Sequence, residues 1–140
     1  MMPTSHDNPA TDAEARAELT RAVQRYFDLM YDCDTSAFDA VFAPTVQLHG
    51  YRDGRFVMWP ASTYKAILQE RPSPKSLDAV RADEILFMDL VSDAMAFVKV
   101  RVQIAAREFV DYLTWHRIES RWLITSKGFH LQSGSSSKRA

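Results

Sequence analysis

The chain lacks the cysteine pairs that stabilise small secreted proteins through disulfides, and it has no segment that resembles a membrane span. Its 140 residues include one cysteine, Cys33, so no disulfide can form within the chain and a reducing compartment is expected. No run approaches the roughly 20 apolar residues that a membrane span requires, and the polar start of the chain lacks the apolar segment of a signal peptide. These absences favour a cytoplasmic protein that has no membrane partner.

An excess of charge of one sign is also lacking. The 17 Lys and Arg residues and 18 Asp and Glu residues are interspersed and leave a net charge of −1. A nucleic-acid partner would require a basic stripe, so none is expected. The four histidines and one cysteine show no metal-ligand spacing, and four glycines are too few for a phosphate-binding loop. We therefore predict no metal and no cofactor.

What is present is an ordinary globular composition. The 46% content of hydrophobic residues is enough for one domain of this length to form a core without a structural metal or disulfide. Residues 1–10 are polar and residues 133–140 are rich in serine. We expect a disordered leader over 1–10, a single domain over 11–132 and a disordered tail over 133–140.

Three helices are predicted in the first half of the chain. Thr11 and Glu14 form a capping box, and apolar residues then recur at three- and four-residue spacing as far as Met30. Asp34 is a good N-cap for a short second helix that Pro44 ends. A strand over 46–51 and an Asp-Gly turn follow, and a third helix begins near residue 60 and ends before residue 72.

The second half of the chain is β-rich. Three dipeptides predict the turns of a four-stranded meander, namely Ser92-Asp93, Ala105-Ala106 and Glu119-Ser120. Residues 96–104 alternate cleanly between apolar side chains and Lys99, Arg101 and Gln103. Helices followed by a run of hairpin strands predict an α+β fold in which the helices pack on one face of the sheet.

Several short blocks carry a family resemblance. They are Val23-Gln24-Arg25-Tyr26, Phe42-Ala43-Pro44 and Arg121-Trp122-Leu123-Ile124, together with Arg52-Asp53-Gly54, Arg71-Pro72-Ser73-Pro74 and Lys127-Gly128-Phe129-His130. With this order of elements the chain resembles the nuclear transport factor 2-like superfamily, which includes ketosteroid isomerase and SnoaL-type cyclases. The last three blocks are similar to its subgroup labelled "putative lumazine-binding". The resemblance covers residues 15–131 and implies a cone-shaped, strongly curved, mostly antiparallel sheet of cystatin-like form, wrapped around three N-terminal helices.

The resemblance does not carry over a known reaction. Ketosteroid isomerase uses a carboxylate base with an oxyanion hole made of a tyrosine and a protonated aspartic acid. By position the tyrosine matches Tyr26, the base falls at Gly50, or at His49 if the strand shifts by one residue, and the aspartic acid falls at Thr114. Gly50 cannot accept a proton and Thr114 is a poorer donor, so steroid isomerisation by this mechanism is not expected. The residue pattern of scytalone dehydratase is not present either.

A pocket is predicted on the inner face of the sheet. If Thr114 faces inward, its strand neighbours two residues away do so as well. The family layout adds aromatic residues at the mouth. The predicted ligand-binding residues are Tyr26, Trp59, Tyr64, Tyr112, Thr114, His116, Lys127 and Phe129. The catalytic candidates are Tyr26, His49 and His116, since an imidazole transfers protons near neutral pH.

Each of these residues also has a purely structural interpretation. Tyr26 suits a core tyrosine whose hydroxyl finds one partner, and His116 suits a wall residue better than a base. Lys127 on an inner face must pair, reach the rim, or lose its proton. Reaching the rim is the plainest outcome, holding an anionic ligand comes second, and forming a Schiff base comes third.

The opposite, convex face of the sheet is predicted to carry large apolar side chains. They are Phe97, Leu113, Trp115, Trp122 and Ile124. An exposed patch of that size is larger than monomers usually tolerate. Members of the resembled superfamily commonly dimerise through this face, so we predict a two-fold homodimer.

Three functions are consistent with these patterns. The favoured one is a protein that binds a small, largely apolar or aromatic molecule, because an apolar pocket with few polar anchors is typical of such sites. The alternative is an acid–base enzyme, an isomerase, dehydratase or cyclase, with His116 or His49 as base and Tyr26 as hydrogen-bond donor. The third is an interaction module whose sheet face binds a partner.

Overall fold

Two helical elements begin the chain, and a third helix lies between the second and third strands. The computed structural model of the protein describes residues 9–134. Along the chain the elements are α1 (Pro9–Asp32), the 3-10 helix η2 (Thr35–Ala40), β1 (Phe42–Arg52), β2 (Arg55–Pro60), α2 (Ala61–Glu70), β3 (Asp83–Leu90), β4 (Met95–Ile104), β5 (Arg107–Ile118) and β6 (Arg121–Ser133).

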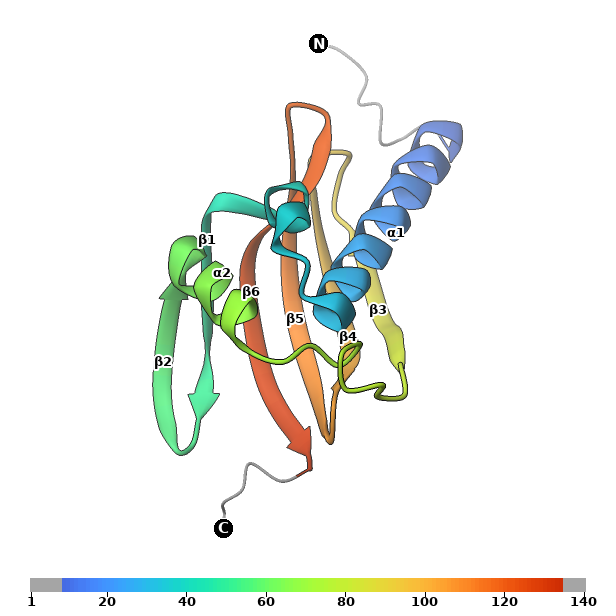
Figure 1. Cartoon of the computed structure of the whole chain (residues 1–140). Helices are drawn as coiled ribbons and strands as arrows, with labels where there is room; N and C mark the ends of the chain where they lie inside the picture. The colour runs from blue at the N-terminus through green and yellow to red at the C-terminus, as the bar shows by residue number, and fades with distance from the viewer. Residues whose placement is uncertain (1–8, 135–140) are drawn as a thin grey trace.

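The six strands form one curved sheet in the order β2-β1-β6-β5-β4-β3. Every neighbouring pair is antiparallel except β1 and β6, which run parallel. The two α-helices lie on the same face of the sheet, α1 over β4 and β6 and α2 against β1 and β2 (Figure 1). This arrangement confirms the predicted α+β class with a curved, mostly antiparallel sheet.

The core lies between α1 and the inner face of the sheet. On β4 the even-numbered residues from Ala96 to Ile104 are buried, as the alternation predicts. They share the core with Leu19, Val23 and Phe27 on one side of α1. Burying a side chain of this size stabilises the fold by roughly 1.5–3 kcal/mol. The periodic apolar residues of both elements therefore fix the layers.

The predicted cap at Asp34 and the predicted turns are confirmed, whereas Thr11 lies inside α1 and does not begin it. Asp34 caps η2 by accepting from the Ser36 N–H at 3.1 Å. Asp53 and Gly54 have φ of 52° and 81°, the two positive values that a tight type I′ hairpin turn requires. The three predicted meander turns separate β3 to β6. Helix α1 begins at Pro9, within the predicted leader, and the rest of the leader and residues 135–140 lie outside the described residues.

Pro44 does not end a helix as predicted, because β1 already begins at Phe42 and runs through it. The pairing of β1 with β6 is interrupted between Phe42 and Gln47. A proline lacks the N–H of a ladder bond and is tolerated at such an irregularity. The exposed Pro44 therefore costs the sheet no hydrogen bond.

The prediction of which face of β5 points inward is wrong. Val98 pairs with Leu113 and Val100 with Asp111, so odd-numbered residues of β5 share the inner face with even-numbered residues of β4. Tyr112 is 49% exposed on the outer face, where Thr114 and His116 also lie. The expectation failed because it took the inward position of Thr114 from the resembled enzyme, whereas pairing with β4 sets the face.

The predicted convex patch is also wrong, because of the face of β5 and because the pairing of β5 with β6 is irregular between Thr114 and Trp115. Leu113, Trp115, Trp122 and Ile124 are all at most 3% exposed and belong to the core of the single chain. Of the predicted set, Phe97 alone lies on the outer face, where it pairs with Thr114. These four residues stabilise the monomer and are not available to a second subunit.

Gly50, rather than His49, faces inward, which settles the register that the sequence left open. It pairs with Phe129 of β6, while His49 stacks beside Phe56 on the outer face. A Cβ atom at Gly50 would lie 2.6 Å from both the ring and the carbonyl oxygen of Phe129. The missing side chain lets the Phe129 ring lie against β1.

We expect Gly50→Ala to destabilise the protein by about 1–3 kcal/mol, because overpacking displaces the Phe129 ring and the backbone of β6. Gly128→Ala is the matched control, since a Cβ there would meet nothing closer than the Tyr112 Cβ at 3.9 Å. Chemical denaturation measures both. Equal free energies of unfolding for the two variants would contradict the close approach.

Candidate functional site

A pocket lies between α2 and the sheet and is lined in part by residues of the β1–β2 turn and of the start of β5. The β1–β2 and β4–β5 turns lie at the same end of the sheet (Figure 1). The pocket encloses about 630 Å³ of space, its open mouth included. One wall is aromatic, the base holds buried polar groups, and the mouth carries arginines. A pocket that combines aromatic, buried polar and charged side chains in this way is typical of small-molecule sites.

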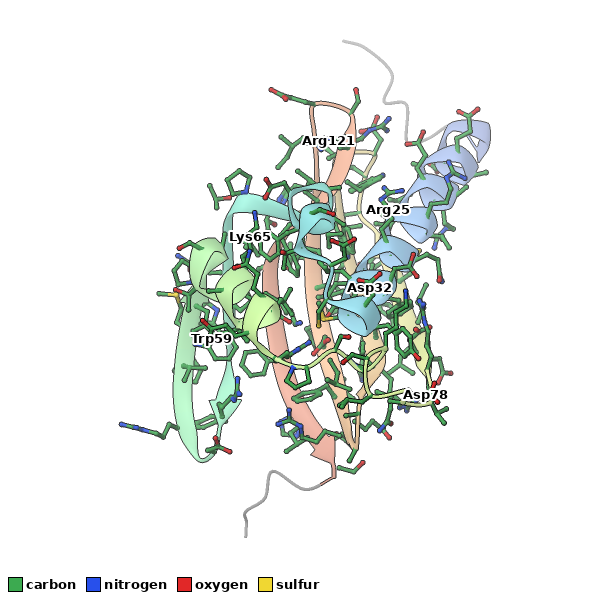
Figure 2. All side chains as sticks on the ribbon, viewed as in Figure 1. Arg25, Asp32, Trp59, Lys65, Asp78 and Arg121 are labelled. Carbon is green, nitrogen blue, oxygen red and sulfur yellow. The ribbon has the colours of Figure 1, made fainter. Side chains whose placement is uncertain are left out.

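Three rings form the aromatic wall, which we call the aromatic stack. Trp59 of β2 lies parallel to Phe129 of β6 at 5.4 Å between ring centroids, and to Tyr64 of α2 at 6.0 Å. The interplanar angles are 13° and 14°. Figure 2 shows Trp59 on the α2 side of the sheet. Parallel faces of this kind suit an additional flat ring.

Four side chains meet at the base of the pocket and form what we call the buried polar cluster: Tyr26, Tyr64, Asp111 and Lys127. Their exposed fractions do not exceed 4%. The Tyr26 hydroxyl donates to Asp111 Oδ2 at 2.5 Å, and Lys127 Nζ donates to the Tyr64 hydroxyl at 3.1 Å. Lys127 Nζ also lies 3.9 Å from Asp111 Oδ2 and about 5 Å from the centres of both tyrosine rings. The two buried charges therefore compensate each other and are further held by neutral donors and ring faces.

One acceptor atom of the buried polar cluster has no hydrogen-bond partner among the described residues. This atom is Asp111 Oδ1, which is buried. Buried polar atoms are nearly always paired, and an unpaired one calls for an explanation. Because Asp111 lines the pocket, a donor on a bound molecule would satisfy this oxygen.

The environment of Tyr26 keeps its hydroxyl protonated. Burial raises the pKa of Tyr26 well above its usual value, and the neighbouring Asp111 charge raises it further. A protonated phenol can go on donating to Asp111 across the physiological range. Tyr26 is thus a positioning residue that holds the carboxylate from the side of α1.

Arginines gather at the mouth of the pocket. Arg52 ends β1, Arg71 follows α2 and Arg107 begins β5. The Arg52 guanidinium lies 5.5 Å from the centre of the Trp59 ring. Burial lowers the pKa of Arg107, and the positive charges of Arg52 and Arg71 lower it further. Arg107 therefore lies close enough to Arg52 and Arg71 to be repelled by both.

The structure brings together about half of the residues predicted for the site. Trp59, Tyr64, Lys127 and Phe129 line the pocket, and Tyr26 lies behind it, linked through Asp111. Lys127 belongs to the buried base and does not reach the rim.

The other predicted site residues face away from the pocket, and their assignment to it is wrong. Tyr112, Thr114 and His116 lie on the outer face because of the β5 register, and His116 Nδ1 is 2.6 Å from Thr125 Oγ1. His49 is on the same outer face. Neither histidine can act on a molecule in this pocket.

Two residues that matter at the site were not among the predicted ones. Asp111 alternates with Leu113 and Trp115, and a carboxylate in step with core residues is a signal of a buried polar site. Arg71 stands in a block that the sequence analysis quoted for its resemblance, yet no periodicity marks its direction. Its place becomes visible only once α2 is packed against β1.

Comparison with solved structures identifies the fold as nuclear transport factor 2-like. A protein of unknown function of this fold from Silicibacter pomeroyi DSS-3 superposes with a TM-score of 0.74 at 22% identity, over 86% of this chain and 98% of that one. One from Methylobacillus flagellatus KT gives 0.74 at 17% identity, over 94% and 100%. One from Shewanella baltica OS155 gives 0.73 at 17%, over 91% and 98%.

The chain belongs to the family described as "Putative lumazine-binding", whose sequence model matches residues 14–130. No curated protein is similar enough in sequence to match. Within residues 9–134, no helix is both long and apolar enough to cross a membrane. In the same range, no three His, Cys, Asp or Glu side chains are grouped so that they could hold a metal ion.

Tyr26→Phe tests the link between α1 and the buried carboxylate. At neutral pH we expect a loss of about 1–3 kcal/mol, because Asp111 Oδ2 loses its donor. The folded-state pKa of Tyr26 is raised, so its stabilisation is complete below the unfolded value of about 10 and is lost as the pH rises above it. The deficit of the variant should therefore shrink between about pH 9 and pH 11.

Chemical denaturation across that pH range measures the effect. Tyr51→Phe is the control, because the Tyr51 side chain is 68% exposed and should show neither the deficit nor its pH dependence. A deficit for Tyr26→Phe that stays constant up to pH 11 would contradict the assigned role.

Proposed function

We propose that this protein binds a small, planar, aromatic molecule in the pocket between α2 and the sheet. The observation that carries the proposal is the aromatic stack of Trp59, Tyr64 and Phe129, which stands directly beside the buried polar cluster. Flat walls orient a ring, and a few polar groups at one end give it a direction. The family description points to a fused heteroaromatic ring, and the free Asp111 Oδ1 would accept a ring N–H.

An acid–base enzyme is the less favoured function. The histidines that the sequence offered as bases lie on the outer face of the sheet. A reaction in the pocket would have to use Asp111 or Lys127, and both are already engaged with Tyr26 and Tyr64. Binding requires nothing of these groups beyond their present positions.

A cytoplasmic location stays a prediction from composition.

We also propose that two copies associate through the outer face of the sheet. This face carries an aromatic cluster of Phe87, Phe97 and Tyr112, with ring centroids 6.4 and 5.4 Å apart. Phe87 is 55% exposed and Tyr112 is 49% exposed, although both are large and apolar. A two-fold pair of such patches would cover both at once.

Titration with 2-naphthamide, a neutral bicyclic probe, followed by NMR of the tryptophan side chains, tests the binding proposal. We expect the Trp59 signal to shift and Trp59→Ala to weaken binding by roughly 5- to 20-fold, because stacking contributes about 1 kcal/mol beyond the buried area. Phe56→Ala is the matched control, since Phe56 lies on the same strand but on the outer face. Equal weakening by both variants would argue against the pocket.

Sedimentation equilibrium at micromolar concentration tests the dimer. Tyr112→Arg should shift the protein toward the monomer, because it places a charge within the apolar patch. Leu77→Arg, which changes an exposed residue between α2 and β3, should leave the dimer intact. A wild-type protein that sediments as a monomer would refute the association.

A further inference from the structure

One edge of the Arg71 guanidinium is buried in the pocket wall without a partner. Its Nε and Nη2 atoms are closed off from solvent and make no hydrogen bond to any described residue. Arg71 directly follows α2, and its backbone N–H is held by the Ile67 carbonyl oxygen at 3.1 Å. The end of the helix therefore fixes the backbone from which the Arg71 side chain extends.

The two unpartnered atoms belong to the same edge of the guanidinium plane. Their N–H bonds run side by side, at the spacing of the two oxygens of a carboxylate, which such an edge binds through two parallel hydrogen bonds. Leaving buried donors of a charged group unpaired is costly. The geometry of this edge thus matches one kind of acceptor in particular.

The guanidinium keeps its charge in this position. Burial lowers the pKa of Arg71, while the neighbouring Tyr64 and Cys33 raise it, and the net direction is upward. Tyr64 is also part of the aromatic stack. The charged edge therefore lies close to the place where a flat ring would stack.

The remaining charges of the pocket also favour an anion. Four cationic side chains line it, Arg52, Arg71, Arg107 and Lys127, against the carboxylates of Asp53 and Asp111. Lys127 and Asp111 face each other in the buried polar cluster, and Arg52 and Arg71 repel Arg107 at the mouth. An anion placed among the arginines would relieve that repulsion.

We infer that the pocket takes an aromatic carboxylate, with the ring against the aromatic stack and the carboxylate on the Nε–Nη2 edge of Arg71. The inference rests on the proposed binding function and adds the charge and the orientation of the ligand. Arg107 and Arg52 close over the anionic end from the turns at the mouth. Asp111 Oδ1, at the base, excludes a second carboxylate there and accepts a donor from the far end of the ring.

Calorimetric titration of the full chain with 2-naphthoate and 2-naphthamide tests the inference, because the two probes have nearly the same shape and differ in charge. We expect the carboxylate to bind roughly 10- to 100-fold more tightly, the range of a charge-assisted pair of hydrogen bonds. Arg71→Gln should remove this preference, so that 2-naphthoate binds no more tightly than 2-naphthamide. Arg121→Gln, at the end of the sheet away from Trp59, is the control for loss of one positive charge (Figure 2).

The outcomes separate the inference from the proposed function. If the wild-type protein binds both probes equally, the anionic ligand is refuted and ring binding stands. If neither probe binds at millimolar concentration, both are refuted. A preference for 2-naphthoate that survives Arg71→Gln refutes the assignment to Arg71. Should that variant not fold, Arg71→Lys keeps the charge but not the parallel edge, and an unchanged preference there would refute the bidentate contact.

Discussion

Asp111 and Lys127 face each other on adjacent strands, 3.9 Å apart, where the core excludes water. A buried charge that loses its partner is strongly destabilising, so each constrains the other. Tyr26 reaches this pair from α1 and Tyr64 reaches it from α2. The buried polar cluster thus connects both helices to β5 and β6. These contacts determine the position of α2 over the sheet and therefore the shape of the pocket.

The pocket exists because the core is incomplete at one end. Over most of the sheet, valines and leucines fill the space beneath α1. Toward the β4–β5 turn the inner face changes to Asp111, Lys127 and Phe129, which line the pocket. Gly50 allows the Phe129 ring to lie flat against β1, and Trp59 then stacks on it. An absent side chain on one strand therefore shapes the aromatic wall built by its neighbours.

Much of the fold could be predicted from the sequence because the signals were local. Turns with positive φ at Asp53-Gly54, the cap at Asp34 and the alternation of β4 each depend on a few adjacent residues. The face of β5 could not be predicted in that way. Residues 112–116 carry large side chains on both faces, so only their pairing with β4 decides which set is inward. The site was difficult to predict for the same reason. Asp111 and Arg71 belong to the pocket only because of contacts with strands and helices that are distant in the chain.

The parallel pairing of β1 with β6 also has a consequence for the order of folding. Leu48 is paired with Lys127, roughly 80 residues later in the chain. Contacts between residues so far apart form slowly, because a long loop must close before they stabilise anything. During synthesis the hairpin of β1 and β2 cannot join the sheet until β6 has been made. Until then one edge of β5 stays unpaired. The aromatic wall is therefore among the last parts of the molecule to assemble, since Phe129 itself arrives with β6.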